Sequence, residues 1–142
     1  NVVEQIEHMT AYIRKRAPQK VQFTVHAKDR DIPAMISPPL FDWVVENLLK
    51  NALDAMEGKG AIDIYIESHP ADVIIDVSDT GKGIPKAYYE KVFKPGFSTK
   101  KRGWGLGLSL AKRIIEDYHK GRLYVKSSEL TKGTTFRILL RK

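Results

Sequence analysis

Apolar side chains recur along the chain at two different spacings, and each spacing predicts one kind of element. Over residues 2–16 an apolar side chain follows every three or four positions, as at Ile6 and Met9, which predicts an amphipathic helix. Pro18 ends this helix, because proline lacks a backbone donor and clashes with the preceding turn. Residues 21–27 then alternate apolar and polar side chains, the pattern of a half-buried strand.

The next helix is predicted over residues 40–56. Ser37 and two prolines precede it, which fits an N-cap residue followed by a first turn that tolerates proline. Gly58 and Gly60 follow the helix and end it. Residues 32–36, between the first strand and this helix, predict a short second strand.

The second half of the chain predicts four strands, one long loop and a further helix. Residues 62–67 alternate isoleucine with polar side chains, and residues 73–78 are rich in valine and isoleucine. Residues 80–104 are rich in glycine and charge, which predicts a long functional loop with a short helix near residues 87–92. The remaining elements are a helix over residues 106–118 and strands over residues 123–126 and 134–140.

This order of elements predicts an α+β fold, arranged as a two-layer α/β sandwich. Strand pairs follow one another without an intervening helix, which favours a mixed, mostly antiparallel sheet with about three helices packed on one face. At 142 residues, the chain fits a single domain over residues 1–142.

Composition narrows the classes of function. The 42% hydrophobic and 29% charged content is typical of a globular domain, and the lack of cysteine excludes disulfides and thiolate metal sites. No apolar run approaches the roughly 20 residues of a membrane helix, and no signal peptide is predicted. The net charge of +7 favours either an anionic partner or a solvated basic surface, and both interpretations stay open on charge alone.

A polar stripe runs along the helix predicted at residues 40–56. Asn47 and Asn51 are four residues apart and therefore lie on one face, and Asp54 falls close to the same face. Amide and carboxylate oxygens suit Mg²⁺, which keeps several waters and takes few protein ligands. The stripe thus predicts either a ligand-facing surface or a solvated helix face.

A carboxylate followed by alternating glycines comes directly after the strand at residues 73–78. Asp79 stands where the sheet ends, and Gly81 and Gly83 let the backbone approach a flat ligand closely. A carboxylate can accept a hydrogen bond from the exocyclic amine of adenine. An ordinary turn is the alternative interpretation of this segment.

A third candidate motif, rich in glycine, leads into the last predicted helix. Gly103, Gly105 and Gly107 alternate just before its first turn, where backbone N–H groups and the helix dipole favour a phosphate. The segment does not follow a strand in a βαβ unit, so it is not a dinucleotide-binding fingerprint, and no P-loop sequence is present.

The order and spacing of these motifs resemble the nucleotide-binding boxes of the GHKL superfamily (Bergerat fold), and most closely the ATP-binding catalytic domain of bacterial sensor histidine kinases. Two positions depart from the family pattern: Gly96 stands where a bulky aromatic residue is common, and Trp104 where a small or polar one is common. The matching segments are the N box at residues 47–52, the G1 box at 79–84, the F box at 93–100, the G2 box at 103–108 and the late motif at 133–136.

The resemblance implies a site for ATP and Mg²⁺. Asn51 would coordinate Mg²⁺ on the ATP phosphates with Asn47 in support, Asp79 would bind the adenine amine, and Lys100 would act at the phosphates as a third catalytic residue. Residues 86–104 would form a lid over the nucleotide. The full set of nucleotide-binding residues that the resemblance implies is Asn51, Asp54, Asp79, Gly81, Gly83, Ile84, Phe93, Ser98, Thr99, Lys100, Lys101, Arg102, Gly103, Gly105, Leu106, Gly107, Leu108 and Thr135.

The implied activity is that of a protein-histidine kinase in two-component signal transduction. The domain would bind ATP or ADP and donate the γ-phosphoryl group to a histidine on a dimerisation domain outside this chain, with a response regulator downstream. Contacts with nucleic acid or membrane are not expected, and the domain is expected in the cytoplasm. The histidines of this chain are interpreted as structural or surface residues, so the chain is expected to bind nucleotide without phosphorylating itself: His8, His26, His69 and His119.

Three alternatives remain beside this interpretation. An ATPase of the gyrase, chaperone or mismatch-repair kind needs a glutamate four residues before Asn51, where this chain has Asn47, and Glu46 points about 100° away around the helix. A basic nucleic-acid-binding module would show interleaved basic and aromatic residues, which the sequence lacks. A degenerate nucleotide sensor without phosphotransfer is the third.

Overall fold

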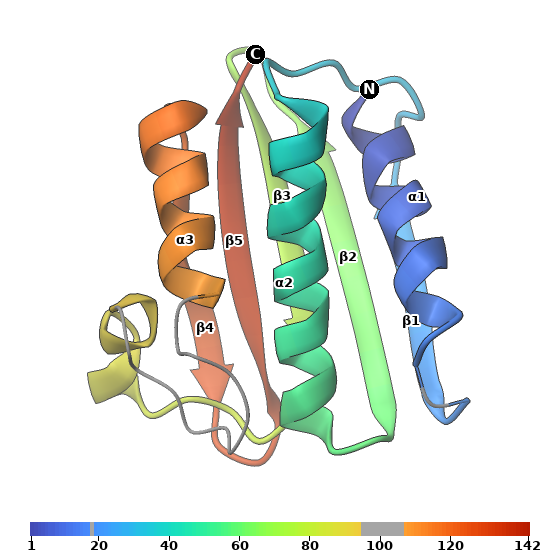
Figure 1. Ribbon diagram of the computed structural model, residues 1–142, viewed down its shortest axis with the longest axis vertical. Helices are drawn as coiled ribbons and strands as arrows, with labels where there is room; N and C mark the ends of the chain where they lie inside the picture. The colour runs from blue at the N-terminus through green and yellow to red at the C-terminus, as the bar shows by residue number, and fades with distance from the viewer. Residues whose placement is uncertain (18, 95–106) are drawn as a thin grey trace.

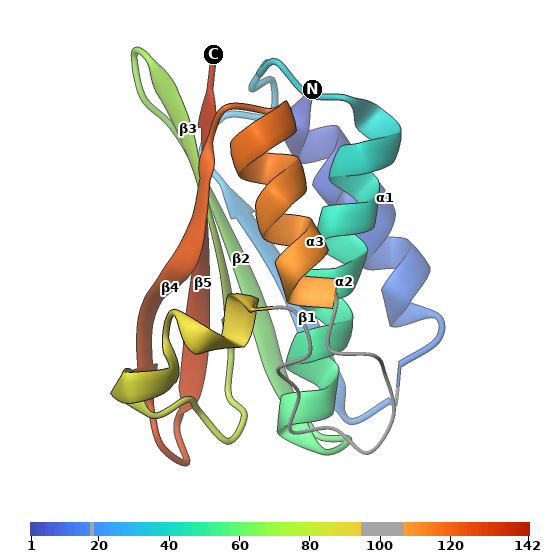
Figure 2. The same ribbon diagram turned by 60° about the vertical axis from the view of Figure 1, so that its left-hand side comes forward.

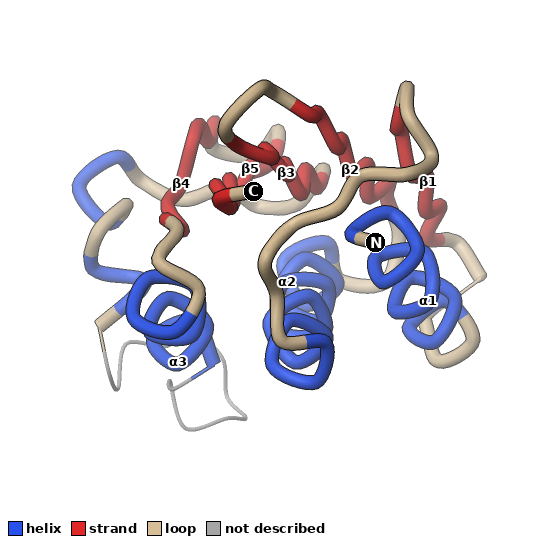
Figure 3. Tube along the Cα trace, turned by 90° about the horizontal axis from the view of Figure 1, so that it is seen from above, coloured by secondary structure: helices blue, strands red, loops and turns tan. Residues whose placement is uncertain are grey.

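The computed structural model describes residues 1–17, 19–94 and 107–142, which form one sheet with helices on one face (Figures 1 and 3). The helices are α1 (Val2–Arg14), α2 (Pro38–Met56) and α3 (Gly107–Arg113), which continues as the π-helical turn η3 (Ile114–Tyr118). The short 3₁₀ turns are η1 (Lys86–Tyr88) and η2 (Lys91–Phe93), and the strands are β1 (Val21–Ala27), β2 (Gly60–Ser68), β3 (Asp72–Asp79), β4 (Arg122–Glu129) and β5 (Gly133–Arg141). No helix among the described residues is long and apolar enough to cross a membrane.

The sheet has five strands in the order β1-β2-β3-β5-β4. β1 pairs parallel with β2, and every other pair is antiparallel. α2 forms the crossover that parallel pairing of β1 and β2 requires. The predicted α+β fold, with a mixed sheet and helices on one face, is confirmed.

The core lies between the sheet and the helices because every strand alternates. On β2, Ile62, Ile64 and Ile66 are at most 3% exposed and face the helices, whereas Tyr65 is 43% exposed on the open face. α2 lies over the middle of the sheet and buries Leu48 and Leu49 against it (Figure 1). Each such side chain contributes about 1.5–3 kcal/mol by leaving water.

The strand predicted at residues 32–36 is wrong, because this segment has no regular secondary structure and forms no ladder with the sheet. Its contact with the sheet is a hydrogen bond of 3.4 Å from Met35 N to Arg141 O at the end of β5. Pro33 cannot donate a ladder hydrogen bond. Ile32 is 1% exposed, and its carbonyl accepts a hydrogen bond of 2.9 Å from Val2 N. Ile32 thus anchors the first turn of α1 through its backbone carbonyl, whereas Met35 of the same segment is 75% exposed.

The last helix is described from Gly107 onwards and changes its hydrogen-bond spacing at Ile114. His119 N donates to Ile114 O at 3.0 Å, a bond that spans five residues. The ring of His119 is 7% exposed, and its Nε2 accepts from Ser37 N at 3.0 Å while Nδ1 donates to Ile114 O at 2.9 Å. His119 therefore joins the end of α3 to the start of α2, which fits the structural role expected of it.

An ion pair on the open face of the sheet stabilises its centre. Asp76 is 8% exposed and accepts two hydrogen bonds from Arg137, from Nε at 2.8 Å and from Nη2 at 2.9 Å. Burial alone raises the pKa of Asp76, but the hydrogen bonds and charges of Arg137 and Lys126 outweigh it and hold this pKa below its ordinary value. The carboxylate is therefore more stable ionised in the folded state than in the unfolded state.

We expect Arg137→Gln to lower the free energy of unfolding at pH 7 by about 1–3 kcal/mol, because the nearly buried Asp76 carboxylate loses its bidentate partner. A lowered folded-state pKa gives stability that is present above the unfolded pKa and lost as the pH falls through the folded one. The difference between wild type and variant should therefore shrink below about pH 4. Urea denaturation at pH 7 and pH 3.5 measures it. Lys50→Gln, which breaks an exposed pair with Glu46, is the control and should change stability by less than about 0.5 kcal/mol.

Candidate functional site

Asp79 ends β3 and is held by two backbone donors. It is 7% exposed, and its Oδ1 accepts hydrogen bonds from Gly81 N at 2.8 Å and from Thr134 N at 3.3 Å. Oδ2 accepts no hydrogen bond from the described residues. The carboxylate is thus fixed through one oxygen and presents the other.

The electrostatic surroundings of Asp79 disfavour its charge. Burial raises the pKa of Asp79, and the bonds from Gly81 and Thr134 only partly oppose this effect, so the pKa lies above its ordinary value. No cation neutralises it among the described residues. An incompletely compensated, nearly buried carboxylate is a frequent property of binding sites.

Gly83 and Gly133 explain how the segment after Asp79 reaches the β4–β5 hairpin. Gly83 has φ +82°, and a Cβ there would lie 2.4 Å from Glu129 O. Gly133 has φ +136°, and a Cβ there would lie 1.9 Å from Asp79 O. Only glycine tolerates both the backbone conformation and the contact, so the two segments pack backbone against backbone.

The two asparagines of α2 differ in what they contact. Asn47 donates from Nδ2 to Trp43 O at 2.8 Å, and its Oδ1 faces Gly107, where a Cβ would lie only 2.8 Å away. Asn51 is half-buried, and its side chain has no hydrogen bond with the described residues. Asp54, one turn further on, is exposed and engaged in an interaction. Asn47 therefore supports the start of α3, and Asn51 offers its amide.

The segment that follows the G1 box lies against the edge strand β4 (Figure 2). Ile84 N donates to Ser128 Oγ at 2.7 Å, and Tyr89 Oη donates to Ser128 O at 3.0 Å. Phe93 is 6% exposed and packs edge-on against Phe136 at 5.9 Å between ring centroids. The predicted nucleotide-binding residues Ile84 and Phe93 thus anchor this segment to the sheet.

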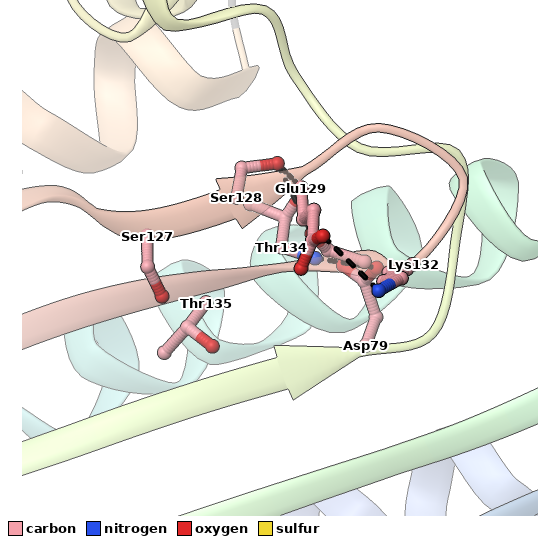
Figure 4. A pocket seen from close by; sticks show the side chains of 8 residues that line it. Asp79, Ser127, Ser128, Glu129, Lys132, Thr134 and Thr135 are labelled. Carbon is pink, nitrogen blue, oxygen red and sulfur yellow. Dashed lines mark hydrogen bonds and ion pairs between the residues drawn. The ribbon is translucent and has the colours of Figure 1, made fainter.

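An open hollow of about 310 Å³ borders on Asp79 at the end of the sheet, and its other lining residues belong to the β4–β5 hairpin (Figure 4). Thr134 and Ser128 stand on the face of the sheet that the helices cover. Thr135 stands on the open face, where its Oγ1 lies 2.7 Å from Ser78 Oγ. The structure gives Thr134 the direct contact with Asp79, and the role of Thr135 in the base pocket stays a prediction.

The structure brings together most of the predicted residues that it describes. Asp79, Gly83 and Ile84 meet the hairpin. Gly81 lies against Ala55, and Lys82 N donates to Ala55 O at 3.0 Å, which joins this segment to the end of α2. Leu108, just after Gly107, packs partly buried against the core. The other predicted residues lie outside the described residues: Ser98, Thr99, Lys100, Lys101, Arg102, Gly103, Gly105 and Leu106.

Two residues of the site escaped the sequence analysis. Thr134 donates its N–H to Asp79, and Ser128 contacts both Ile84 and Thr134. Alternation along residues 134–140 could have identified Thr134, because it shares the parity of the core residues Phe136 and Ile138. The position of Ser128 depends on an irregularity in β4 that leaves no clear pattern in the sequence.

Residues 36–142 match the family model described as "Histidine kinase-, DNA gyrase B-, and HSP90-like ATPase", and the chain belongs to this family. It is 35% identical over 122 residues to sensor histidine kinase ZraS of Escherichia coli (strain K12), covering 86% of this chain and 26% of that protein. It is 40% identical over 92 residues to sporulation kinase A of Bacillus subtilis (strain 168), covering 65% of this chain and 15% of that protein.

Solved structures narrow the class further. The nucleotide-free catalytic domain of histidine kinase ThkA is 31% identical and superposes with a TM-score of 0.86 over 100% of this chain and 95% of that one. ThkA in complex with response regulator protein TrrA is 28% identical with a TM-score of 0.87, covering 100% of this chain and 40% of that one. The resemblance to histidine kinase catalytic domains is therefore confirmed. The chain spans about a quarter or less of the two curated relatives.

Proposed function

We propose that this chain binds Mg-ATP and donates the γ-phosphoryl group to a histidine on a dimerisation domain outside it. The observation that carries the proposal is the carboxylate of Asp79, fixed through Oδ1 and open at Oδ2. An adenine amine donates a hydrogen bond, which Oδ2 can accept, whereas guanine carries an oxygen acceptor at the equivalent position. Asp79 thus supports adenine as the base.

The residues of α2 fit a magnesium ion held mainly by phosphate oxygens and water. No group of three or more histidine or acidic side chains that could hold a metal occurs among the described residues, so a site built only from such side chains is not supported there. Mg²⁺ in nucleotide sites takes one or two protein oxygens beside the phosphates, and the amide oxygen of Asn51 provides one. When bound, the ion neutralises charge on the phosphates as the phosphoryl group transfers.

The chain's own residues position the nucleotide for transfer. Asp79 orients the base, Asn51 orients the phosphates, and Asn47 holds the start of α3 beside them. We propose Asp54, Gly81, Gly83, Phe93, Leu108 and Thr135 as further nucleotide-binding residues, and residues 98–107 as the part of the site nearest the phosphates. Lys100 would supply positive charge at the transferring group.

Phosphotransfer is favoured over hydrolysis by the surroundings of Glu46. Its carboxylate accepts from Lys50 Nζ at 2.9 Å along the helix, so the nearest acid to the position of an ATPase general base is engaged in an ion pair. We propose residues 1–142 as one catalytic domain that works in the cytoplasm with a dimerisation domain and a response regulator. Nucleic acid and membrane are not among its proposed partners.

Calorimetric titration with ATP, with and without Mg²⁺, tests binding, and radiolabelled ATP with a supplied dimerisation domain tests transfer. We expect the chain to bind ATP and to label the histidine of the supplied domain while remaining unlabelled itself. Three of its four histidines are engaged: His119 is buried, and His26 and His69 pair with Asp63 and Glu67.

Phosphohistidine on this chain alone would contradict the proposed division between catalytic and acceptor domains. Steady ATP hydrolysis without an acceptor would instead favour the ATPase alternative. Binding without any transfer to an acceptor domain from the same parent protein would favour a nucleotide sensor.

A further inference from the structure

The hydroxyl of Ser128 joins the segment after Asp79 to the first residues of β5. Its Oγ accepts from Ile84 N at 2.7 Å, donates to Gly133 O at 3.1 Å and lies 2.8 Å from Thr134 Oγ1. A hydroxyl has one proton and two lone pairs, so these three bonds saturate Ser128 Oγ when Thr134 donates to it. The hydroxyl therefore has a fixed place in the site.

The backbone of Ser128 holds the same segment at a second point. Its carbonyl accepts from Tyr89 Oη at 3.0 Å, five residues beyond Ile84. Ser128 thus bonds to Gly133 and Thr134, the residues beside Asp79. It also bonds to Ile84 and Tyr89, which belong to the segment leading to η2.

A β-bulge directs Ser128 to this position. In the register of β4 and β5, Val125 lies opposite Phe136 and Ser127 opposite Thr135, so Lys126 is an extra residue. If β4 kept Lys126 but had no bulge, strict alternation from the buried Val125 would put Ser127 on the helix-covered face and Ser128 on the open face. Bulges often turn a side chain towards a functional site in this way.

We propose that Ser128 is a positioning residue for the nucleotide, a role that rests on the proposed function. It holds Thr134 N against Asp79 Oδ1, where the bond is 3.3 Å long, and it ties the segment after the G1 box to the edge of the sheet. Loss of its hydroxyl would loosen the carboxylate and the start of the predicted lid together.

The test compares Ser128→Ala with two matched variants of the whole chain. Ser128→Thr keeps the hydroxyl, and Thr24→Ala removes an exposed hydroxyl on β1, at the opposite edge of the sheet, which has no hydrogen bond with the described residues. We expect Ser128→Ala to raise the ATP dissociation constant about fivefold to tenfold. Ser128→Thr and Thr24→Ala should stay within about twofold of wild type.

Amide hydrogen exchange provides a second measurement that needs no nucleotide. Ile84 N–H loses its acceptor in Ser128→Ala, so its exchange should accelerate in this variant and not in Thr24→Ala. An unchanged ATP affinity in Ser128→Ala, with wild-type binding intact, overturns the role of Ser128 alone. Equal weakening by Thr24→Ala or by Ser128→Thr overturns it as well. Absence of nucleotide binding by the wild-type chain overturns the proposed function itself.

Discussion

Asp79→Asn is expected to weaken ATP binding about 10- to 100-fold while leaving the domain folded. The asparagine oxygen can accept the hydrogen bonds from Gly81 N and Thr134 N in place of Oδ1. Its NH₂ group then takes the place of Oδ2. Because the adenine amine is also a donor, the two groups cannot form a hydrogen bond with each other. Loss of a charge-assisted hydrogen bond costs about 1.5–3 kcal/mol, which corresponds to this range of affinity.

The same variant should be more stable than wild type without nucleotide, and increasingly so as the pH rises. Burial raises the pKa of Asp79 in the folded state. Protonated Asp79 therefore stabilises the wild-type fold at low pH, and this contribution is lost as the pH rises through the folded-state pKa. Asparagine carries no such charge. Thermal denaturation between pH 4 and pH 8 measures the trend alongside calorimetric titration with ATP.

Asp76→Asn is the matched control on the same strand. The pKa of Asp76 is lowered by Arg137, so removing its charge should destabilise the domain most at neutral pH, the opposite trend. Its side chain stands on the open face of the sheet, so ATP affinity should stay within about twofold of wild type. Full ATP binding by Asp79→Asn would contradict the assignment of Asp79 to the base, whatever the stability shows.

The sequence predicts the sheet and the place of Asp79 well because both depend on local patterns. Alternation sets the buried face of β2 and β3, and it delivers Asp79 to the end of a strand on the helix side. Ile32 shows where such patterns mislead: its apolar segment is predicted as a strand, but Pro33 cannot donate to a ladder and Ile32 O accepts from Val2 N instead. Only tertiary packing separates these two outcomes.

Contacts across the site depend on local irregularities of the backbone that tertiary contacts determine and local sequence patterns do not reveal. The bulge at Lys126 changes the face of Ser128, and nothing in the composition of β4 marks the extra residue. The change to a π-helical turn at Ile114 likewise follows from the bonds of His119 rather than from helix propensity. For residues 98–106, which we propose to act at the phosphates, the family resemblance remains the basis of the prediction.

Asn51→Ala is expected to have the largest effect on transfer, lowering the rate of phosphorylation of a supplied acceptor domain about 100- to 1000-fold. Removing one group that stabilises developing charge at a reacting centre costs about 2.7–4 kcal/mol of transition-state stabilisation. ATP affinity should fall in the presence of Mg²⁺ and stay near the wild-type value in EDTA, because Asp79 still holds the base. Radiolabel transfer and paired titrations measure these quantities.

Stability separates this effect from misfolding. Alanine is a better helix former than asparagine, and the Asn51 side chain has no hydrogen bond with the described residues to lose, so the variant should be as stable as wild type or slightly more stable. Lys50→Ala, on the solvent side of the same turn, controls for changes in α2. If Asn51→Ala instead keeps the wild-type difference between the ATP affinity in Mg²⁺ and the ATP affinity in EDTA, the metal contact has to come from another residue. In that case the polar stripe of α2 is a supporting surface for α3.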